Sequence, residues 1–433
     1  MSPVTFRKTS GAILAGLTLL AATAQAAEVT RVVSAFDDEN GFDLNLTASW
    51  LHEAKSALIK RESESAATAM GPIGVAPDFK YAQTRDVLNL RLDFGVLWDV
   101  GLHVQAPLVL ADSNTVTLDS GVSADNAAFL QSPSASGSQV FKSPTRSGFQ
   151  DLGLGVTWAV FNQRRDDTKP TWTLGFDADL DVFKDMRFDP ANPNGNQATG
   201  LGYHQLIWST WVSKRFRHFD PYFGASYMLP IRTNGSIFQN YNPATQTSVN
   251  PQQQAMVTIG VEQIAWENPR GDQRVTIEAR GHLEEHFAGR GYSELWEPLS
   301  GSPNCTVTAG GTGTPCRPDL DVGTDAQGNP AAAPYPGVTN IDAYGSFGGD
   351  VGLNIQVGRY IRFRGLFGLT VDAPHFITNA NAGVDTNHDG VVNSLDKAEA
   401  NPVYRDSIDS PGRRFYVEQS EIWSLLIEGS LMF

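Results

Sequence analysis

Apolar and polar residues alternate at every second position along much of the chain. Between residues 88 and 96, for example, Leu88, Leu90 and Leu92 occupy one set of positions, and Asn89 and Arg91 occupy the other. Because successive side chains of a β-strand point to opposite faces, this pattern predicts a strand with one apolar and one polar face. Twelve segments share the pattern: 42–50, 88–96, 102–110, 152–160, 172–180, 206–212, 223–229, 257–261, 275–283, 347–357, 361–371 and 423–433.

The connections between these segments are short and long in turn. Short turns such as 98–101 and 358–360 join the segments into hairpins. Six long stretches rich in Gly, Pro and Asn follow, at roughly 59–83, 112–148, 183–202, 230–253, 287–342 and 373–414. Antiparallel strands whose connections are sorted by length in this way are typical of a closed barrel. The sequence therefore predicts an all-β fold, a twelve-stranded antiparallel up-and-down transmembrane β-barrel with long extracellular loops.

The apolar face of every predicted strand needs an environment that favours it. No stretch beyond residue 26 approaches the roughly 18–20 consecutive apolar residues of a helical membrane span. A soluble solenoid or sandwich is the alternative, but lipid around a closed barrel explains why aromatic residues gather at the short turns, since such rings prefer the membrane–water boundary. These aromatics are Trp98, Trp158, Phe161, Trp172, Phe216, Phe219, Tyr222, Trp266 and Tyr360.

The N-terminal region has the pattern of an export signal. Arg7 and Lys8 precede an apolar stretch, and Ala24-Gln-Ala26 supplies the small residues that a signal peptidase reads. We expect a signal peptide at 1–26, a periplasmic lead-in at 27–41 and the barrel at 42–433. The lead-in either folds into the periplasmic mouth of the barrel or is a disordered approach. Cleavage removes two positive charges, which changes the net charge from -15 to -17, and this acidity argues against nucleic acid as a partner.

The last eleven residues, Trp423 to Phe433, alternate at period two and end on an aromatic residue. This ending resembles the closing strand of a Gram-negative outer-membrane β-barrel. The resemblance implies a location in the outer membrane, contact with its lipid, and recognition of the strand ending in Phe433 by the outer-membrane assembly machinery. It also implies that the short turns and both termini lie in the periplasm and that the long loops lie outside the cell. The sequence does not predict the oligomeric state.

Charged residues on the polar faces are expected to line the lumen. They concentrate on four successive strands, and with Arg91 from an earlier strand the set is Arg91, Glu262, Arg274, Glu278, Arg280, Asp350, Arg362 and Arg364. One interpretation is a constriction whose fixed charges select a small polar or charged solute. The other is an internal salt-bridge network that plugs the barrel, since charges removed from water must be paired. The sequence leaves both open.

The last long loop contains a pattern suited to a hard cation. Oxygen-bearing residues occupy its positions one, three, five, nine and twelve, and Gly390 occupies position six, where a calcium loop turns sharply. The pattern resembles the calcium loop of dockerin repeats and, more distantly, an EF-hand. The resemblance implies a structural Ca²⁺ whose ligands are Asp385, Asn387, Asp389, Val391 through its carbonyl, Asn393 and Asp396. An acidic turn without metal is the alternative.

The two cysteines, Cys305 and Cys316, lie in one long loop with ten residues between them. In an exported protein such a pair predicts a disulfide. No His accompanies the pair, which argues against zinc.

Three functions are compatible with the sequence. The barrel is a narrow passive channel or transporter for small polar or charged solutes, which the charged lumen favours. Alternatively, it is a closed scaffold whose calcium-braced loops serve adhesion or receptor contact. A third possibility is a lipid hydrolase, because His52 and Ser56 lie on the outward face of the first strand, although no catalytic motif surrounds them. We favour transport and predict that the protein is not an enzyme.

Overall fold

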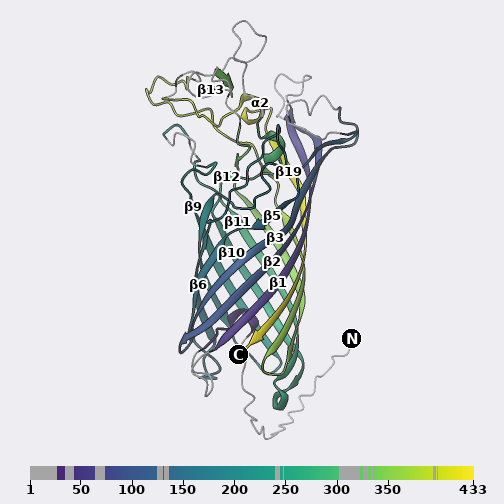
Figure 1. Cartoon of the computed structure of the whole chain (residues 1–433), viewed down its shortest axis with the longest axis vertical. Helices are drawn as coiled ribbons and strands as arrows, with labels where there is room; N and C mark the ends of the chain where they lie inside the picture. Colours follow the sequence, from purple (N-terminus) through teal and green to yellow (C-terminus); the bar gives the residue numbers. More distant parts are fainter. Residues whose placement is uncertain are drawn as a thin grey trace, which may run out of the picture.

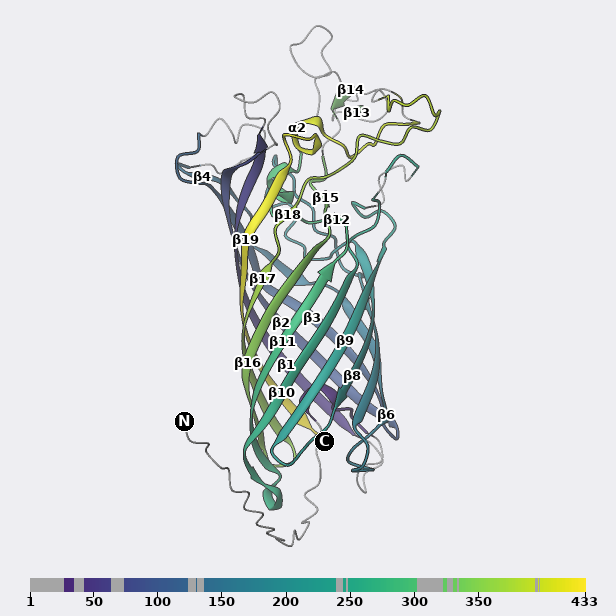
Figure 2. The same ribbon diagram turned by 180° about the vertical axis from the view of Figure 1, so that it is seen from behind.

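The structure is a computed structural model that describes residues 27–34, 43–63, 74–123, 130, 136–238, 244–246, 248–301, 322–324, 330–332, 335–393, 396 and 398–433. They form a tall barrel (Figure 1). One end carries the short turns and the C-terminus, and we call it the turn end. The other end carries the long loops, which stand above the barrel in both views, and we call these loops the crown (Figure 2).

Twelve antiparallel strands make the barrel wall, as the alternation predicts. They are β1 (Leu44–Ser63), β2 (Gly74–Leu97), β3 (Val100–Leu118), β6 (Leu152–Phe161), β7 (Thr171–Leu180), β8 (Tyr203–Ser213), β9 (Phe219–Arg232), β10 (Gln254–Asn268), β11 (Gln273–His286), β16 (Tyr344–Val357), β17 (Ile361–Asp372) and β19 (Phe415–Met432). Each strand pairs with the next in this order, and β1 pairs with β19 from Asn45 opposite Met432 to Arg61 opposite Phe415. The ring of twelve strands is therefore closed, and each of these strands pairs with a neighbour on both sides.

Shorter elements lie at the two ends of the barrel. At the crown these are β4 (Gln139–Lys142), β5 (Arg146–Phe149), β12 (Gly289–Gly291), β13 (Val322–Thr324), β14 (Pro330–Ala332), β15 (Thr339–Ile341), β18 (His375–Phe376), α1 (Trp296–Leu299) and α2 (Asp406–Asp409). The 3-10 turns η1 (Glu28–Thr30) and η3 (Pro269–Gly271) lie toward the turn end. Among the described residues, no helix is long and apolar enough to cross a bilayer.

The barrel exterior is apolar and the interior is polar. Ile259 on β10 is 67% exposed, and Leu283, Val351, Phe363 and Ile427 on neighbouring strands are also exposed. In water, an apolar surface continued around a barrel would be strongly unfavourable, whereas acyl chains are a matching solvent. Most aromatics predicted at the short turns lie on this surface, which fits an interfacial belt. Tyr222 is the exception, because its ring is buried inside the lumen.

The first two strands extend further than the sequence pattern indicated. β1 continues to Ser63 and β2 begins at Gly74, so most of the predicted loop 59–83 is strand. Similarly, β3 continues to Leu118, into the predicted loop 112–148. Polarity is reversed in these extensions, because Ile59 and Phe79 point inward and are buried. A prediction that identifies strands by their outward apolar residues therefore ends these strands too early.

The inward apolar residues of the extensions form one side of a crown core. Ile59, Phe79 and Val116 belong to one cluster of buried side chains with Phe141 and Leu295 from the loops. The same cluster contains Trp296 and Leu299 of α1, Ile377, Ile408 of α2 and Phe415. The crown is thus a packed layer that covers the loop end of the lumen.

Candidate functional site: a polar lumen closed at both ends

Residues 27–34, which we call the N-terminal stopper, lie inside the turn end of the lumen. The Glu28 N–H donates to Glu262 Oε1 at 2.7 Å, and the Glu28 carboxylate forms an ion pair with Arg362. Further along, the Thr30 hydroxyl bonds the Ser213 hydroxyl at 2.7 Å. These contacts join the stopper to β8, β10 and β17. Residues 27–34 are the first eight residues of the predicted lead-in.

Two cavities flank the N-terminal stopper. One, of about 320 Å³, opens toward the turn end and is lined by Asn162, Arg164 and Tyr360, among other residues. The other, of about 340 Å³, lies deeper in the lumen, and we call it the chamber. Arg31, Val32 and Val33 line both cavities, so the stopper is the partition between them.

The chamber wall carries both signs of charge. Its lining includes Arg91, Asp93, His103, Asp177, Arg364 and Glu428. Arg91 bonds Asp93 at 2.7 Å, and His103 Nε2 lies 2.5 Å from Asp177 Oδ1. Gly155 allows the close approach of His103 and Asp177, because a Cβ at this position would lie 2.2 Å from His103 Nε2.

The predicted lumen residues all face the interior, and most form ion pairs. Arg364 donates to both oxygens of Glu278, at 3.0 and 2.9 Å, and Arg280 bonds Asp350 at 2.8 Å. Arg91 forms an ion pair with Asp93 on its own strand, β2, and Arg362 forms one with Glu28 of the N-terminal stopper. Arg274 and Glu262 lie beside Asp220, toward the turn end of the lumen. The salt-bridge interpretation therefore describes most of the set, while Arg91, Arg362 and Arg364 also line the chamber.

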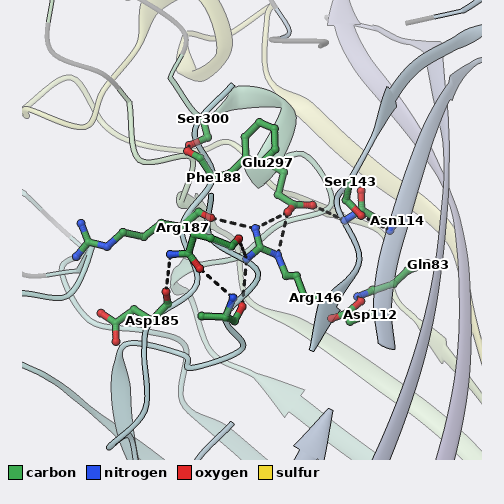
Figure 3. Close-up of polar contacts among 12 residues, drawn as sticks. Gln83, Asp112, Asn114, Ser143, Arg146, Asp185, Arg187, Phe188, Glu297 and Ser300 are labelled. Carbon is green, nitrogen blue, oxygen red and sulfur yellow. Dashed lines mark hydrogen bonds and ion pairs between the residues drawn. The ribbon is translucent and has the colours of Figure 1, made fainter. Parts of the chain in front are cut away.

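Residues 292–301, which contain α1 and which we call the crown stopper, pack at the loop end of the lumen. Glu297 is its main anchor, because Arg146 donates to Glu297 Oε1 at 2.6 Å and Asn114 donates to Oε2 at 2.7 Å (Figure 3). The Ser300 hydroxyl donates to the Phe188 carbonyl at 2.9 Å. The Trp296 ring lies 4.9 Å from the Arg146 guanidinium carbon.

Arg146 is buried at the loop end and forms several hydrogen bonds there. Its remaining N–H groups donate to the carbonyls of Arg187, Asn196 and Ala198 at 3.1, 3.2 and 3.1 Å. Its side chain is 4% exposed and that of Glu297 is 1% exposed. Burial raises the pKa of the Glu297 carboxyl, and the Arg146 guanidinium opposes this effect. A buried charge stays ionised only when such a partner is present.

A second ion pair holds the crown stopper to the barrel wall. Glu294 Oε1 lies 2.8 Å from Lys55 Nζ on β1. Burial is the largest single effect and would raise the pKa of Glu294, but the Lys55 ammonium, His375 and hydrogen bonds to the carboxylate together hold this pKa below its usual range. Because the folded-state pKa is lowered, the pair contributes stability above the unfolded pKa of about 4.3, and this contribution is lost as the pH falls.

The predicted calcium loop lies in the crown and is exposed. The Asp385 carboxylate accepts the N–H groups of Asp389 at 3.2 Å and Gly390 at 2.9 Å, and Asn387 Oδ1 accepts the Asp389 N–H at 2.8 Å. The sharp turn expected at Gly390 is present, with φ at +89°. Within the described part of the chain, no three His, Cys, Asp or Glu side chains are grouped so that they hold a metal ion. The calcium site therefore stays a prediction.

Calorimetric titration of Ca²⁺ tests this prediction. If the loop binds calcium, we expect saturable heat from the native protein and none from a variant carrying Asp385→Ala and Asp389→Ala. The loss of both carboxylates removes the charges that a hard cation requires. Equal heats from the two proteins would remove the calcium assignment.

Three other predictions concern the signal peptide, the disulfide and the hydrolase alternative. The predicted signal peptide, 1–26, and the cysteines Cys305 and Cys316 lie outside the described residues. His52 and Ser56 are described, and His52 Nδ1 bonds Asp86 Oδ1 at 2.9 Å, while Ser56 lies further along β1, opposite Ala82. This arrangement neither supports the hydrolase alternative nor excludes catalysis elsewhere.

Sequence reasoning did not identify the crown stopper or its anchor. Glu297 and Arg146 lie 151 residues apart, in stretches that the polarity pattern marks only as loops. The apolar run around Leu295, Trp296 and Leu299 within a polar loop was the available sign that this segment packs inward.

No protein-family model matches the chain, and no curated protein sequence matches it. Among solved structures, it is similar to an outer membrane channel from Pseudomonas putida F1, with 10% identity, a TM-score of 0.36, and coverage of 90% of this chain and 95% of that one. It is also similar to a Pseudomonas aeruginosa FadL homologue (9% identity, TM-score 0.29, 90% of each chain) and to the outer membrane protease OmpT of Escherichia coli (9%, 0.27, 90% and 97%).

The closed wall and its apolar exterior define the class of the protein. The chain has the fold of a twelve-stranded outer-membrane β-barrel, as the resemblance of its last strand implies.

Proposed function

We propose that the protein is a gated channel of the Gram-negative outer membrane for small polar or charged solutes. The observation that supports this most is the chamber of about 340 Å³, a polar cavity inside the barrel and next to the N-terminal stopper. A barrel that only displays loops has no need of such a cavity. In this proposal, solutes pass when the two stoppers move aside.

The chamber's chemistry supports the proposed solute class. Arg91 and Arg362 provide cationic groups, and Asp177 and Glu428 provide anionic groups on the same wall. Such a wall replaces the hydration of a small ion or a zwitterion better than that of an apolar molecule. The volume is near the lower end of ligand pockets, which span about 300–1,000 Å³, so we infer a solute of few heavy atoms.

The orientation follows from the same proposal. The turn end and the N-terminal stopper face the periplasm, and the crown faces the outside of the cell, as in barrels with short periplasmic turns. The strand that ends in Phe433 is the segment that the outer-membrane assembly machinery would recognise. The apolar exterior contacts membrane lipid.

Planar-bilayer recording of the purified protein tests the proposal. We expect a low mean conductance with brief openings, because two stoppers must be displaced at once. Uptake of small zwitterionic and anionic solutes into vesicles should depend on the protein. A barrel that neither conducts nor admits solute at any voltage would contradict the proposal.

The second candidate function is display of the crown. It is supported by the crown's own apolar core, which includes Phe141, Leu295, Ile408 and Phe415, because a packed loop layer presents a defined surface. A silent barrel whose crown binds cells or host proteins would favour this candidate.

A further inference from the structure

The first main-chain nitrogen of the N-terminal stopper lies deep inside the barrel between two carboxylates. Ala27 is 0% exposed, and its N–H hydrogen-bonds Asp220 on β9. The next N–H, that of Glu28, bonds Glu262 on β10 at 2.7 Å. Asp220 and Glu262 are direct register partners on adjacent strands. Both carboxylates therefore converge on the beginning of the stopper.

The Asp220 and Glu262 carboxylates have few cationic groups near them. Asp220 is 2% exposed and Glu262 is 1% exposed, and Asp220 Oδ1 has no hydrogen-bond partner. Among the described residues, neither carboxylate has a cation within ion-pair distance. Arg274 is near both but is buried with them, and two anions beside one guanidinium leave a negative excess. Burial of such an excess is unfavourable unless another cation binds or a carboxylate takes up a proton.

The neighbouring arginines are already engaged. Arg215 bonds Glu267 at 2.7 Å, Arg364 bonds Glu278, and Arg362 bonds Glu28. A further cation beside Asp220 and Glu262 would have to come from another group. Ala27 supplies a nitrogen at the right place, but an amide nitrogen is neutral and carries one N–H.

Hydrolysis of the bond between Ala26 and Ala27 would convert that nitrogen into the required cation. Ala24-Gln-Ala26 predicts cleavage at this bond. Water adds OH to the Ala26 carbonyl carbon and H to the Ala27 nitrogen, and the released amine takes up a proton, because its usual pKa is about 7.7–8.0. The product is an ammonium group with three N–H donors.

We propose that the mature chain begins at Ala27 and that its α-ammonium binds Asp220 and Glu262, which locks the N-terminal stopper in the barrel after signal cleavage. The Asp220 and Glu262 carboxylates then form an ammonium site that the precursor does not fill. This inference rests on the export proposed above and not on conduction. It makes the closed state of the turn end depend on correct processing.

Trypsin cleavage after Arg31 measures whether the stopper is locked. The protease is too large to enter the lumen, so it reaches Arg31 only when the stopper leaves. Exported protein is extracted in detergent, treated with trypsin, and analysed by mass spectrometry of the intact chain and of the released peptide 27–31. In the native protein we expect an intact mass that begins at Ala27 and slow release.

Two variants remove the proposed pairing in different ways. Insertion of one Gly between Ala26 and Ala27 moves the ammonium by one residue and leaves the barrel sequence unchanged. Asp220→Asn removes one carboxylate. Loss of a buried ion pair should accelerate peptide release at least about tenfold in each. The matched control is Asp166→Asn, which removes an exposed carboxylate from a turn at the same end and should release the peptide at the native rate.

The release rates of the variants and the mass of the mature chain decide whether the inference holds. Release at the native rate from both the insertion variant and Asp220→Asn would overturn the inference, as would a mature N-terminus at another residue. If Asp220→Asn does not fold, which heat-dependent gel migration reveals, the insertion variant decides, because its change lies outside the barrel. The trypsin experiment does not measure conductance. A barrel that does not conduct but keeps its stopper locked would therefore contradict the proposed channel function and leave the ammonium site unaffected.

Discussion

Replacement of Glu297 by glutamine is expected to loosen the crown while the barrel wall stays folded. Arg146 would then be a charged group in an apolar layer without a counter-ion, beside Trp296 and the crown core. Removal of one partner of a buried pair costs about 3–5 kcal/mol. Since α1 and the crown core are packed through this anchor, proteolysis within residues 287–301 should become fast. The transition of the barrel itself should shift little.

The matched control for Glu297→Gln is Asp406→Asn in the same crown. Asp406 pairs with Arg413 at 2.6 Å, but the two side chains are 66% and 54% exposed. Exposed pairs contribute about 0–1 kcal/mol, so this variant should resist protease as the native protein does. Equal protease resistance of Glu297→Gln and Asp406→Asn would show that Arg146 does not anchor the crown stopper.

Replacement of Arg364 by glutamine is expected to destabilise the barrel wall itself. Its partner Glu278 is buried, accepts the Tyr222 hydroxyl at 2.6 Å, and would keep a charge without a cation. The expected loss is again about 3–5 kcal/mol. The measurement is unfolding in lipid vesicles by denaturant, followed by the heat-dependent gel shift of the folded barrel.

Two comparisons identify the cause of that loss. Arg91→Gln removes a guanidinium that is more exposed and pairs with Asp93, so its effect should be no more than about 1 kcal/mol. The double variant Arg364→Met, Glu278→Leu removes both charges and should recover most of the stability. A double variant less stable than Arg364→Gln would mean that packing, and not the unpaired carboxylate, causes the loss.

The membrane-facing half of the fold could be predicted from the sequence because lipid imposes a strict rule there. Each strand must present apolar side chains outward at every second position, as Leu88, Leu90 and Leu92 do, and this constraint determines strand number and face. The chain's twelve strands and the alternation of turns with loops follow from it.

At the crown end of β1 to β3, apolar side chains no longer point outward at every second position. The inward side chains of β1 to β3 are apolar there, as Ile59 and Phe79 illustrate, because they pack against loop residues and not against lipid. Local polarity cannot distinguish this reversed pattern from an irregular loop. The predicted loop 59–83 was therefore too long at both ends.

The stoppers could not be predicted because their contacts join distant parts of the chain. Glu28 and Arg362 are 334 residues apart, and Arg146 and Glu297 are 151 residues apart. The sequence indicated which charges face the lumen, but it left their pairing open. That pairing decides whether a charge connects two strands of the wall, as Arg364 does, or contacts the N-terminal stopper, as Arg362 does.

We propose that the lumen is a conduit with two stoppers in series, and the conductance of a variant altered at both stoppers tests this proposal most directly. One variant joins Ala26 to Ala35 and lacks the N-terminal stopper, a second carries Glu297→Gln, and a third combines both changes. Because either stopper alone blocks the path, we predict a steady conductance in the combined variant that exceeds the sum of the two single variants. A folded combined variant that conducts no more than the native protein would contradict the claim.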